Sequence, residues 1–219
     1  AQCSHCDRPF PSSIALTWSP THRCHECTAH PPAYTKAWTP YAYLPPLRDA
    51  ICLFKYRRHV SLATPLARLM IEALPLSLAV DAILPVPLHP SRLREREFNQ
   101  SLLLADAVGC HLRLPVLCAT LLRTTPSDPQ STLSRSERIT NLRQAFAVHR
   151  PEPILGQRLL LIDDVFTTGT TVNECAKALK QAGAGEVFVL TLARTVETSL
   201  VPDRMLAAQA ADPLDLLRG

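Results

Sequence analysis

The sequence contains no run of apolar residues long enough to cross a lipid bilayer. Its N-terminal stretch, AQCSHC, also lacks the positively charged and apolar regions of a secretory signal peptide. These two absences predict a cytoplasmic location. Any association with the inner face of the membrane would then be made through partner proteins.

Lysine is scarce, with only 4 lysines beside 19 arginines among the 23 basic residues. The net charge of +4 is a mild excess, so the distribution of charge is more informative. Residues 89–150 contain nine arginines, no lysine and five acidic residues. Arginine suits bidentate contacts with phosphate, although most of these side chains are expected on solvated helix surfaces. The candidates for contacts with pyrophosphate or DNA phosphates are Arg92, Arg94, Arg96, Arg123 and Arg138.

The composition excludes a disordered chain, because 47% hydrophobic residues in a chain of 219 can bury a sizeable core. A chain of this length is expected to form one core domain with a small appendage. We expect a zinc-binding module at 1–30, a proline-rich connector with covering helices at 31–80, a main domain at 81–195 and a tail at 196–219.

Four of the eight cysteines form two C-x-x-C pairs near the N-terminus, separated by 17 residues: Cys3 and Cys6, and Cys24 and Cys27. This spacing predicts a closed, structural zinc site with four thiolate ligands. His5 and His25 lie inside the pairs and are alternative ligands. A disulfide framework would need an oxidising compartment, and a redox pair would need only one motif. The other four cysteines lie among apolar residues and are expected to be small core side chains: Cys52, Cys110, Cys118 and Cys175.

The most informative run is LLLIDDVFTTGTT at residues 159–171. Its apolar residues, Leu159 to Ile162, predict a buried parallel strand that ends at two carboxylates. A loop with four threonines around Gly169 follows, and a helix is expected from about Val172. In open α/β sheets, ligands bind at the carboxyl ends of strands, and a helix N-terminus there attracts phosphate.

This arrangement predicts a binding site for a sugar phosphate. Glycine allows close approach of the backbone, threonine hydroxyls add donors, and paired carboxylates suit ribose hydroxyls or a ligand-bound Mg²⁺. Helix capping is the simpler alternative, but it accounts for only one or two polar residues. The predicted ligand-binding residues are Asp163, Asp164, Thr167, Thr168, Gly169, Thr170 and Thr171.

Strands and helices alternate in the main domain, which predicts a parallel sheet flanked by helices. Strands are expected at 82–86, 116–122, 146–148, 159–162 and 187–192. Helices are expected from an N-cap at Ser91 through the apolar run that ends at Ala107, at 135–142 and at 172–182. The polar stretch 124–134 has no periodicity, and loops of this length are usually functional.

The connector has two features with alternative interpretations. Its aromatic residues are expected to pack on the body, with an exposed stacking surface as the alternative: Tyr34, Trp38, Tyr41 and Tyr43. Apolar spacing between Leu47 and Leu74 predicts two covering helices. The basic segment KYRRH at 55–59 between them suits single-stranded nucleic acid, or it is an ordinary helix end or turn.

The run at 159–171 resembles the phosphoribosyl-pyrophosphate (PRPP) signature of type I phosphoribosyltransferases, and the absence of Gly-Lys-Ser/Thr distinguishes it from a P-loop. The whole chain is similar to the ComF/ComFC family, which includes the GntX-type proteins. Four pieces in the family's order carry this resemblance: the paired C-x-x-C module, PVPLHPSRLREREFNQ at 85–100, the stretch from Arg123 through Gln130, Leu133, Arg138 and Asn141 to Ala145–Phe146, and the PRPP loop.

One position departs from the family pattern. Glu97 stands where the family usually has glycine before Phe-Asn. Because glutamate is unfavourable at positive φ, we expect either a helical backbone at this position or a modified site.

The resemblance implies a type I phosphoribosyltransferase fold behind a zinc ribbon, PRPP binding with Mg²⁺, and a role in uptake or utilisation of external DNA. It does not specify a reaction. One hypothesis is a binding protein whose PRPP pocket is a sensor or a relic and whose arginine-rich face holds single-stranded DNA. The alternative is an active phosphoribosyltransferase of nucleotide metabolism that transfers the glycosyl group from PRPP with Mg²⁺. A third is an adaptor whose zinc module docks a DNA-uptake helicase or another competence protein.

Overall fold

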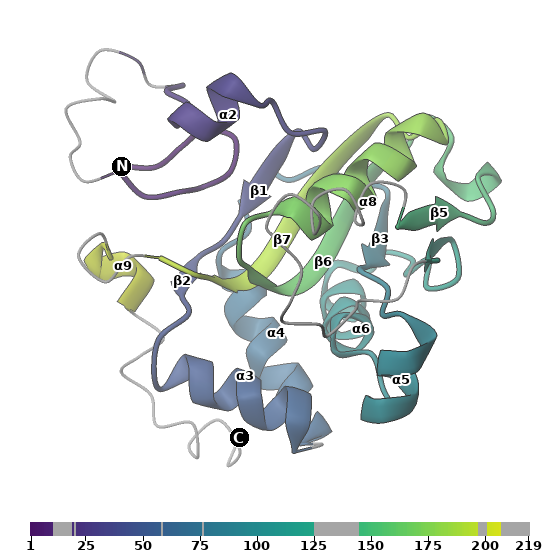
Figure 1. The fold of residues 1–219 in the computed structure, drawn as a ribbon, viewed down its shortest axis with the longest axis horizontal. Helices are drawn as coiled ribbons and strands as arrows, with labels where there is room; N and C mark the ends of the chain where they lie inside the picture. The colour runs from purple at the N-terminus through teal and green to yellow at the C-terminus, as the bar shows by residue number, and fades with distance from the viewer. Residues whose placement is uncertain are drawn as a thin grey trace, which may run out of the picture.

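The strand predicted from Leu159 to Ile162 lies inside a five-stranded parallel sheet, as the computed structural model shows (Figure 1). The structure describes residues 1–10, 19, 21–57, 59–75, 77–124, 145–196 and 201–206. Strand β6 lies between β3 and β7, and β7 pairs on its other side with β1 and β2. The bounds are β1 Lys36–Trp38, β2 Tyr41–Ala42, β3 Ala82–Pro85, β6 Arg158–Phe166 and β7 Glu186–Arg194.

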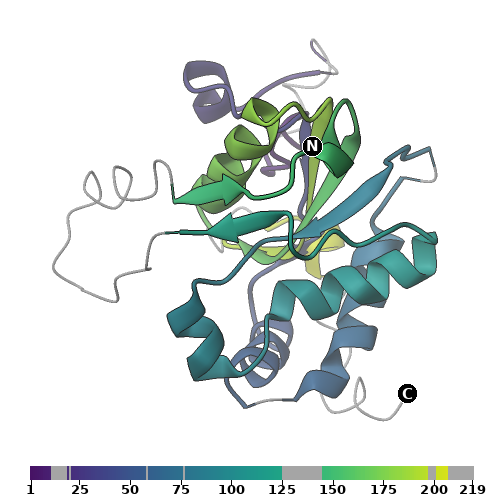
Figure 2. The same cartoon turned by 90° about the vertical axis from the view of Figure 1, so that its right-hand side faces the viewer.

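Helices cover both faces of this sheet, which explains why its strands are almost continuously apolar. Because successive side chains of a strand point to opposite faces, Leu159 and Leu161 pack in one core and Leu160 and Ile162 in the other. Helix α8 lies on one side of the sheet and α3, α4 and α6 lie on the other (Figure 2). The side chains of α8 belong to the first core, and those of α3, α4 and α6 belong to the second. These helices span α3 Leu47–Tyr56, α4 Ala63–Glu72, α6 Gln100–Leu112 and α8 Thr170–Gln181.

Strand β6 continues through the acidic pair, so the prediction that it ends at Ile162 was wrong. Asp163 pairs in register with Thr191, and Phe166 pairs with Arg194. The ladder continues because β7 also extends to Arg194. Both carboxylates therefore project from a hydrogen-bonded strand and not from a loop.

The predicted strand 116–122 was also wrong. Val116 makes only an isolated parallel bridge with Ile83, and a turn follows it. Strand β4 (Leu121–Arg123) instead pairs antiparallel with β5 (Phe146–Val148) in a separate two-stranded sheet. The β5 strand was predicted at this position, but only the tertiary structure supplies its partner.

The long helix predicted after Ser91 is divided into α5 (Pro90–Arg96) and α6. The break lies at Glu97, whose φ of 68° is left-handed, so a helical backbone at this position was the wrong expectation. The N-cap of α5 is His89 and not Ser91: the backbone N–H of Ser91 donates to His89 Nδ1 over 3.2 Å.

Two predictions for the connector were confirmed: its aromatic residues pack on the body, and helices α3 and α4 lie between Leu47 and Leu74. The same region also supplies β1 and β2. Tyr34 and Tyr41 are buried, and the Trp38 ring stacks on Phe188 with a centroid distance of 5.7 Å. The remaining short elements are α2 (His25–Ala29), α9 (Asp203–Leu206) and the 3-10 helices η1 (Val60–Leu62) and η2 (Glu152–Ile154). No helix in the described part of the chain is long and apolar enough to span a membrane.

A buried arginine attaches the N-terminal module to the end of β7. Arg194 Nη1 donates to the carbonyl of Cys6 over 2.7 Å and to Thr39 Oγ1 over 3.3 Å. Its guanidinium also lies 4.9 Å from the centre of the Phe166 ring. Nearby, Asp7 Oδ2 accepts from the backbone N–H of Thr39 over 2.8 Å. The module is therefore fixed beside the strand that carries the acidic pair.

Several predictions lie outside the described residues. These are the helix 135–142, the stretch 125–134 of the predicted loop, and most of the tail after 196.

Replacing Arg194 with glutamine should lower the free energy of unfolding by about 1–3 kcal/mol, because a buried carbonyl loses its charged donor. Urea denaturation measures this difference. Arg158→Gln is the matched control: Arg158 is half-exposed and pairs with Asp81 over 3.3 Å. Its loss should cost less than about 1 kcal/mol. Equal effects of the two substitutions would contradict a docking role for Arg194.

Candidate functional site

Two adjacent carboxylates lie at the carboxyl end of β6, in an interior strand of the sheet. Asp164 is buried, whereas Asp163 is partly exposed. Asp163 Oδ1 accepts two hydrogen bonds of 2.9 Å, one from Ser101 Oγ and one from the backbone N–H of Asp164. These bonds fix the Asp163 carboxylate at the edge where open α/β sheets bind ligands.

Lys55 is the cation that balances Asp164. Its Nζ lies 2.9 Å from Asp164 Oδ2, and both side chains are largely buried. The contact is an ion pair and not a well-aligned hydrogen bond, because Oδ2 has no hydrogen-bond partner among the described residues. The sequence placed Lys55 in a basic segment but gave no indication of this pairing, since the two residues lie far apart in the chain. Ser101 was also missed, although it directly follows the motif that ends at Gln100.

The pKa of Asp163 is raised to about 7. Loss of hydration is the main cause, and the neighbouring charge of Asp164 adds to it, while Lys55 acts in the opposite direction. Below a pH of about 7, Asp163 is mostly protonated and the charge of Asp164 is balanced by Lys55. Above a pH of about 7, the two carboxylates carry one negative charge more than Lys55 neutralises. Two carboxylates with one cation can accommodate a further cation or hydroxyl donors.

The predicted phosphate loop follows β6 directly. Thr167 and Thr168 are exposed, and Gly169 is the N-cap of α8 with a φ of 79°. Thr168 Oγ1 accepts from the backbone N–H of Thr170 over 3.3 Å and lies 2.8 Å from Thr170 Oγ1. Thr170 and Thr171 form the first turn of the helix. The loop therefore presents hydroxyls and the positive end of a 12-residue helix.

Gly169 is required at this position for two reasons. Its φ is left-handed, and a Cβ there would lie 2.4 Å from Cζ of the Phe166 ring. Phe166 is itself held between Arg194 and Tyr34, whose ring lies 6.5 Å away edge-on. The shape of the loop thus depends on side chains near the N-terminal module.

The candidate arginines lie in different surroundings. Arg92 pairs with Glu95 over 2.7 Å, and Arg94 is exposed. Arg123, on β4, lies over the Phe146 ring at 5.5 Å, and its burial lowers its pKa while the charge of Asp163 raises it. Arg138 lies outside the described residues.

Arg96 is brought to α3 by the break between α5 and α6. Phe98 follows the break and packs on Phe54 of α3 with a centroid distance of 5.8 Å. Asn99 caps α6 by accepting from Ser101 N, and its own amide donates to the Val86 carbonyl over 3.1 Å. The segment EFNQS at residues 97–101 therefore contacts both the acidic pair, through Ser101, and α3, through Phe98.

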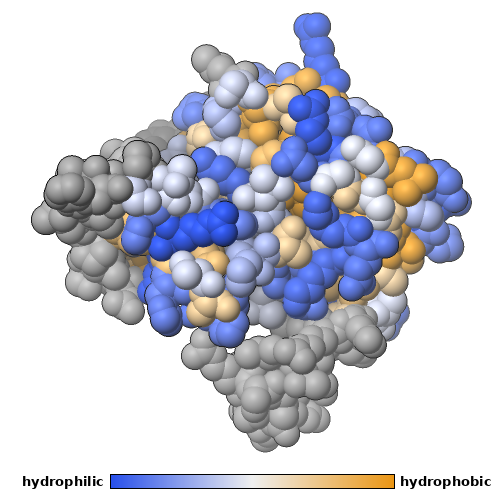
Figure 3. Space-filling model, turned by 90° about the horizontal axis from the view of Figure 1, so that it is seen from above, coloured by the Kyte–Doolittle hydropathy of each residue, from blue (hydrophilic) through white to orange (hydrophobic). Residues whose placement is uncertain are grey.

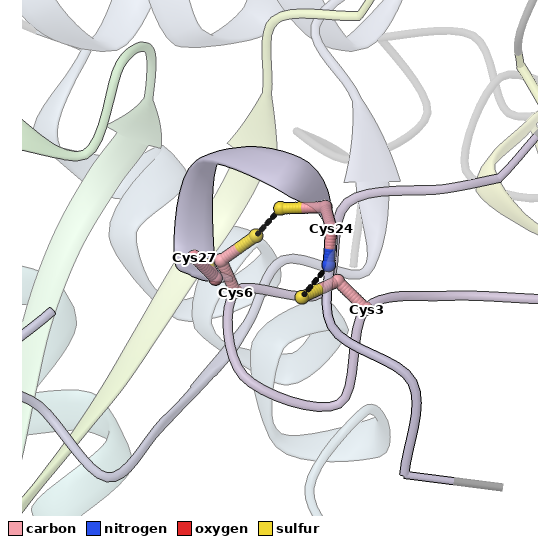
Figure 4. Close-up of side chains that lie close together, drawn as sticks. All are labelled: Cys3, Cys6, Cys24 and Cys27. Carbon is pink, nitrogen blue, oxygen red and sulfur yellow. Dashed lines mark hydrogen bonds between the residues drawn. The ribbon is translucent and has the colours of Figure 1, made fainter. Parts of the chain in front are cut away.

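The four N-terminal cysteines form one cluster, as their spacing predicted (Figure 4). Their sulfur atoms all lie within 4.8 Å of one another, and all four side chains are buried. Cys24 is the N-cap of α2 and Cys27 lies within it, while Cys3 and Cys6 come from the preceding turn. The backbone N–H of Cys24 points to Cys3 Sγ over 3.2 Å. These residues can hold a metal ion.

Charge within the cysteine cluster also favours a cation. A hydrogen bond with Cys27 lowers the pKa of Cys3, and the same contact raises the pKa of Cys27. Buried thiols so close together cannot all ionise without a positive charge among them, and a metal ion bound by them would displace their protons.

The other cysteines divide into two groups. Cys175 is buried and Cys52 is partly buried, as expected of core side chains. Cys110 and Cys118 are exposed, so their assignment to the core was wrong. Cys110 lies on the solvent side of α6, and Cys118 lies in the turn before β4.

The parallel sheet, the acidic pair and the threonine loop together define a phosphoribosyltransferase-like protein. In agreement, residues 100–208 match the family model of the phosphoribosyl transferase domain. The DNA utilization protein YhgH of Salmonella typhi is 32% identical over 210 residues, which cover 89% of this chain and 90% of that protein. Competence protein F of Haemophilus influenzae is 34% identical over 201 residues, which cover 88% and 84%.

This chain belongs to the family of these DNA utilization and competence proteins, the ComF/ComFC family. Competence protein ComFC of Streptococcus pneumoniae is 34% identical over 109 residues, which cover 50% of this chain and 46% of that protein. Among solved structures, the glutamine PRPP amidotransferase of B. subtilis is 16% identical with a TM-score of 0.44, over 73% of this chain and 33% of that one.

Asp163→Asn should remove a pH dependence of stability. Because folding raises the pKa of this carboxyl from 3.8 to about 7, the wild-type free energy of unfolding should fall as the pH rises between these values. Asparagine can still accept both hydrogen bonds and carries no charge. We therefore expect the variant to be about 1–3 kcal/mol more stable than wild type at pH 8 and equally stable at pH 4, by urea denaturation.

Asp81→Asn provides a control of opposite sign. Hydrogen bonds from the backbone and side chain of Arg158 lower the pKa of Asp81. Loss of the Asp81 charge should therefore lower the free energy of unfolding at pH 8. The difference in free energy of unfolding between Asp163→Asn and wild type should grow from pH 4 to pH 8. A difference that stays constant would contradict the raised pKa of Asp163.

Proposed function

We propose that this protein binds PRPP with Mg²⁺ and acts in the uptake or utilisation of external DNA. The observation that carries the proposal is the joining of a carboxylate pair on β6 to a threonine–glycine turn at the start of α8. A ribose 5-phosphate needs hydrogen-bond acceptors for its hydroxyls and donors for its phosphate. The two parts of this edge offer those two chemistries in consecutive residues.

In this proposal, Asp163 and Asp164 accept hydrogen bonds from the ribose hydroxyls, and residues 167–171 hold the 5′-phosphate. Mg²⁺ bound by the pyrophosphate would add charge that an acidic pair with one lysine can accommodate. Arg123 and Arg92 are the candidates among the described arginines for the pyrophosphate, because the Arg123 guanidinium lies within electrostatic reach of both Asp163 and Arg92.

The role in DNA handling is supported by the relatives, which are named for DNA utilization and competence. The arginine-rich region of residues 89–150 supplies positive charge for the DNA backbone, and that binding should weaken steeply with salt. We place this role in the cytoplasm, where a DNA-uptake helicase or another competence protein would be the partner that delivers single strands.

An active phosphoribosyltransferase of nucleotide metabolism is less well supported. Such an enzyme would bind an acceptor beside the PRPP ribose, and the relatives are not named for a transfer reaction. Release of pyrophosphate from PRPP by the pure protein, with or without DNA, would favour the enzyme over the binding protein.

Asp164→Asn should abolish PRPP binding measured by isothermal titration calorimetry with Mg²⁺, because the ribose loses a charged acceptor. Gly169→Ala should weaken binding at least about 10-fold, since the new Cβ displaces the Phe166 ring beneath the loop. Asp81→Asn, which changes a partly exposed acid at the opposite end of the sheet, should bind as wild type does. Circular dichroism establishes that each variant is folded. Unaltered PRPP affinity in folded Asp164→Asn would refute the proposed site.

We also propose that the cysteine cluster binds zinc as a structural ion, since four thiolates in a closed, buried set suit zinc. Purified protein should contain one zinc ion per chain by mass spectrometry of metals. Chelation, or Cys24→Ser, should unfold the N-terminal module and lower the thermal midpoint. Cys118→Ser is the matched control, because that thiol is exposed and outside the cluster. Metal-free protein with an unchanged midpoint would contradict this assignment.

A further inference from the structure

Tyr56 is the most exposed large hydrophobic side chain in the described part of the chain, with 63% of its surface accessible. Tyr56 is the last residue of α3, and the residue before it, Lys55, forms the ion pair with Asp164. A single exposed ring is ordinary on a protein surface. The surroundings of this ring, however, are those of a binding surface.

An arginine from another segment lies over the Tyr56 ring. The guanidinium carbon of Arg96 is 5.0 Å from the ring centre, and Arg96 Nη2 donates to the Tyr56 hydroxyl over 3.5 Å. Arg96 Nη1, the other terminal nitrogen, donates to Gln100 Oε1 over 3.0 Å and so also holds the guanidinium in place. The result is a flat cation and a flat ring held together in advance of any ligand.

Two hollows adjoin at Tyr56. The smaller has a volume of about 80 Å³ and is lined by Lys55, Tyr56, Glu95 and Arg96. The larger is shallow and open, has a volume of about 440 Å³, and is lined by Asp49, Cys52, Leu53, Tyr56 and Arg57. The larger one is within the size range of small-molecule sites, so it can admit a planar group against the ring.

The charge around the ring is positive. The two acids that line the hollows are already paired, Asp49 with Arg48 over 3.1 Å and Glu95 with Arg92 over 2.7 Å. The positive charges of Arg57 and Arg96, which also line the hollows, are therefore available to bind an anionic ligand. Phosphates beside an aromatic ring and an arginine plane are the pattern of single-stranded nucleic acid recognition. A duplex does not satisfy it, because its bases are stacked inside.

We propose that Tyr56 and Arg96 form a stacking site for a base of single-stranded DNA, and that Lys55 links this site to the PRPP site. The DNA assignment rests on the proposed function; the site itself rests on the exposed ring, the arginine above it and the adjoining hollows. Ribose hydroxyls on Asp164, with the charge of Mg²⁺ nearby, would compete with Lys55 for this carboxylate and would release Lys55 Nζ from its ion pair. It lines the smaller hollow and can there bind a DNA phosphate.

The stacking site is tested by fluorescence anisotropy of a dye-labelled oligothymidylate at fixed salt. Tyr56→Ala should weaken binding about 5- to 100-fold, the range for loss of one base stack. Tyr56→Phe should bind as wild type does, because the ring provides the stack. Val60→Ala is the matched control, an exposed apolar residue close to Tyr56 in the chain. PRPP binding by calorimetry should be unchanged in Tyr56→Ala.

An abasic oligonucleotide of the same length separates stacking from charge. It should bind wild type and Tyr56→Ala equally, since neither can stack a base that is absent. Wild-type affinity of Tyr56→Ala for oligothymidylate would overturn the stacking site. A different result is that wild type binds oligouridylate more tightly than oligothymidylate, with a larger loss of affinity in Tyr56→Ala. That result would make RNA the occupant and overturn the DNA assignment. No oligothymidylate binding by wild type would refute the DNA role itself, a result distinct from a failure of Tyr56 alone.

The link through Lys55 has its own measurement. Saturating PRPP with Mg²⁺ should raise the oligothymidylate affinity of wild type by about 5-fold or more, and by reciprocity DNA should raise the affinity for PRPP. Lys55→Gln, once circular dichroism shows it folded, should abolish this gain. An oligothymidylate affinity of wild type that PRPP does not change would overturn the link and leave the stacking site standing.

Discussion

A buried carboxylate on a central strand must be matched by positive charge, and much of this molecule is arranged around that requirement. Asp164 lies on β6 inside a parallel sheet, where an unpaired charge would cost several kcal/mol or force protonation. Lys55 meets it from the last turn of α3, and Ser101 fixes the adjacent Asp163. The helices that cover this face therefore supply the electrostatic balance of the site as well as apolar cover.

The N-terminal module is coupled to the same strand from the other side. Arg194 joins the Cys6 carbonyl to the Phe166 ring, and that ring leaves no room for a Cβ at Gly169. The position of the cysteine module and the shape of the threonine–glycine loop thus depend on a shared buried contact. Seen from above, the described surface is mainly hydrophilic with small hydrophobic patches between polar side chains (Figure 3).

The predictions from sequence succeeded where neighbours in the chain determine the outcome. The C-x-x-C spacing predicted the cysteine cluster, and the apolar run from Leu159 predicted the inner strand. They failed where a distant partner decides. Strand β6 extends past Ile162 because β7 continues beside it, and Val116 forms only a bridge because β4 pairs with β5. A left-handed Glu97 goes against local preference, and the packing of Phe98 on Phe54 in α3 accompanies it.

The sequence by itself determined the composition of the candidate site: a carboxylate pair, a threonine–glycine turn, four cysteines and an excess of arginine over lysine. These features are local, and their chemistry can be read from side-chain types and spacing. Only the tertiary structure decided which charges meet. It paired Lys55 with Asp164 and placed Arg96 over Tyr56. The physical reason is that Coulombic and stacking interactions depend on distance in space, which the folding of the sheet and its covering helices sets.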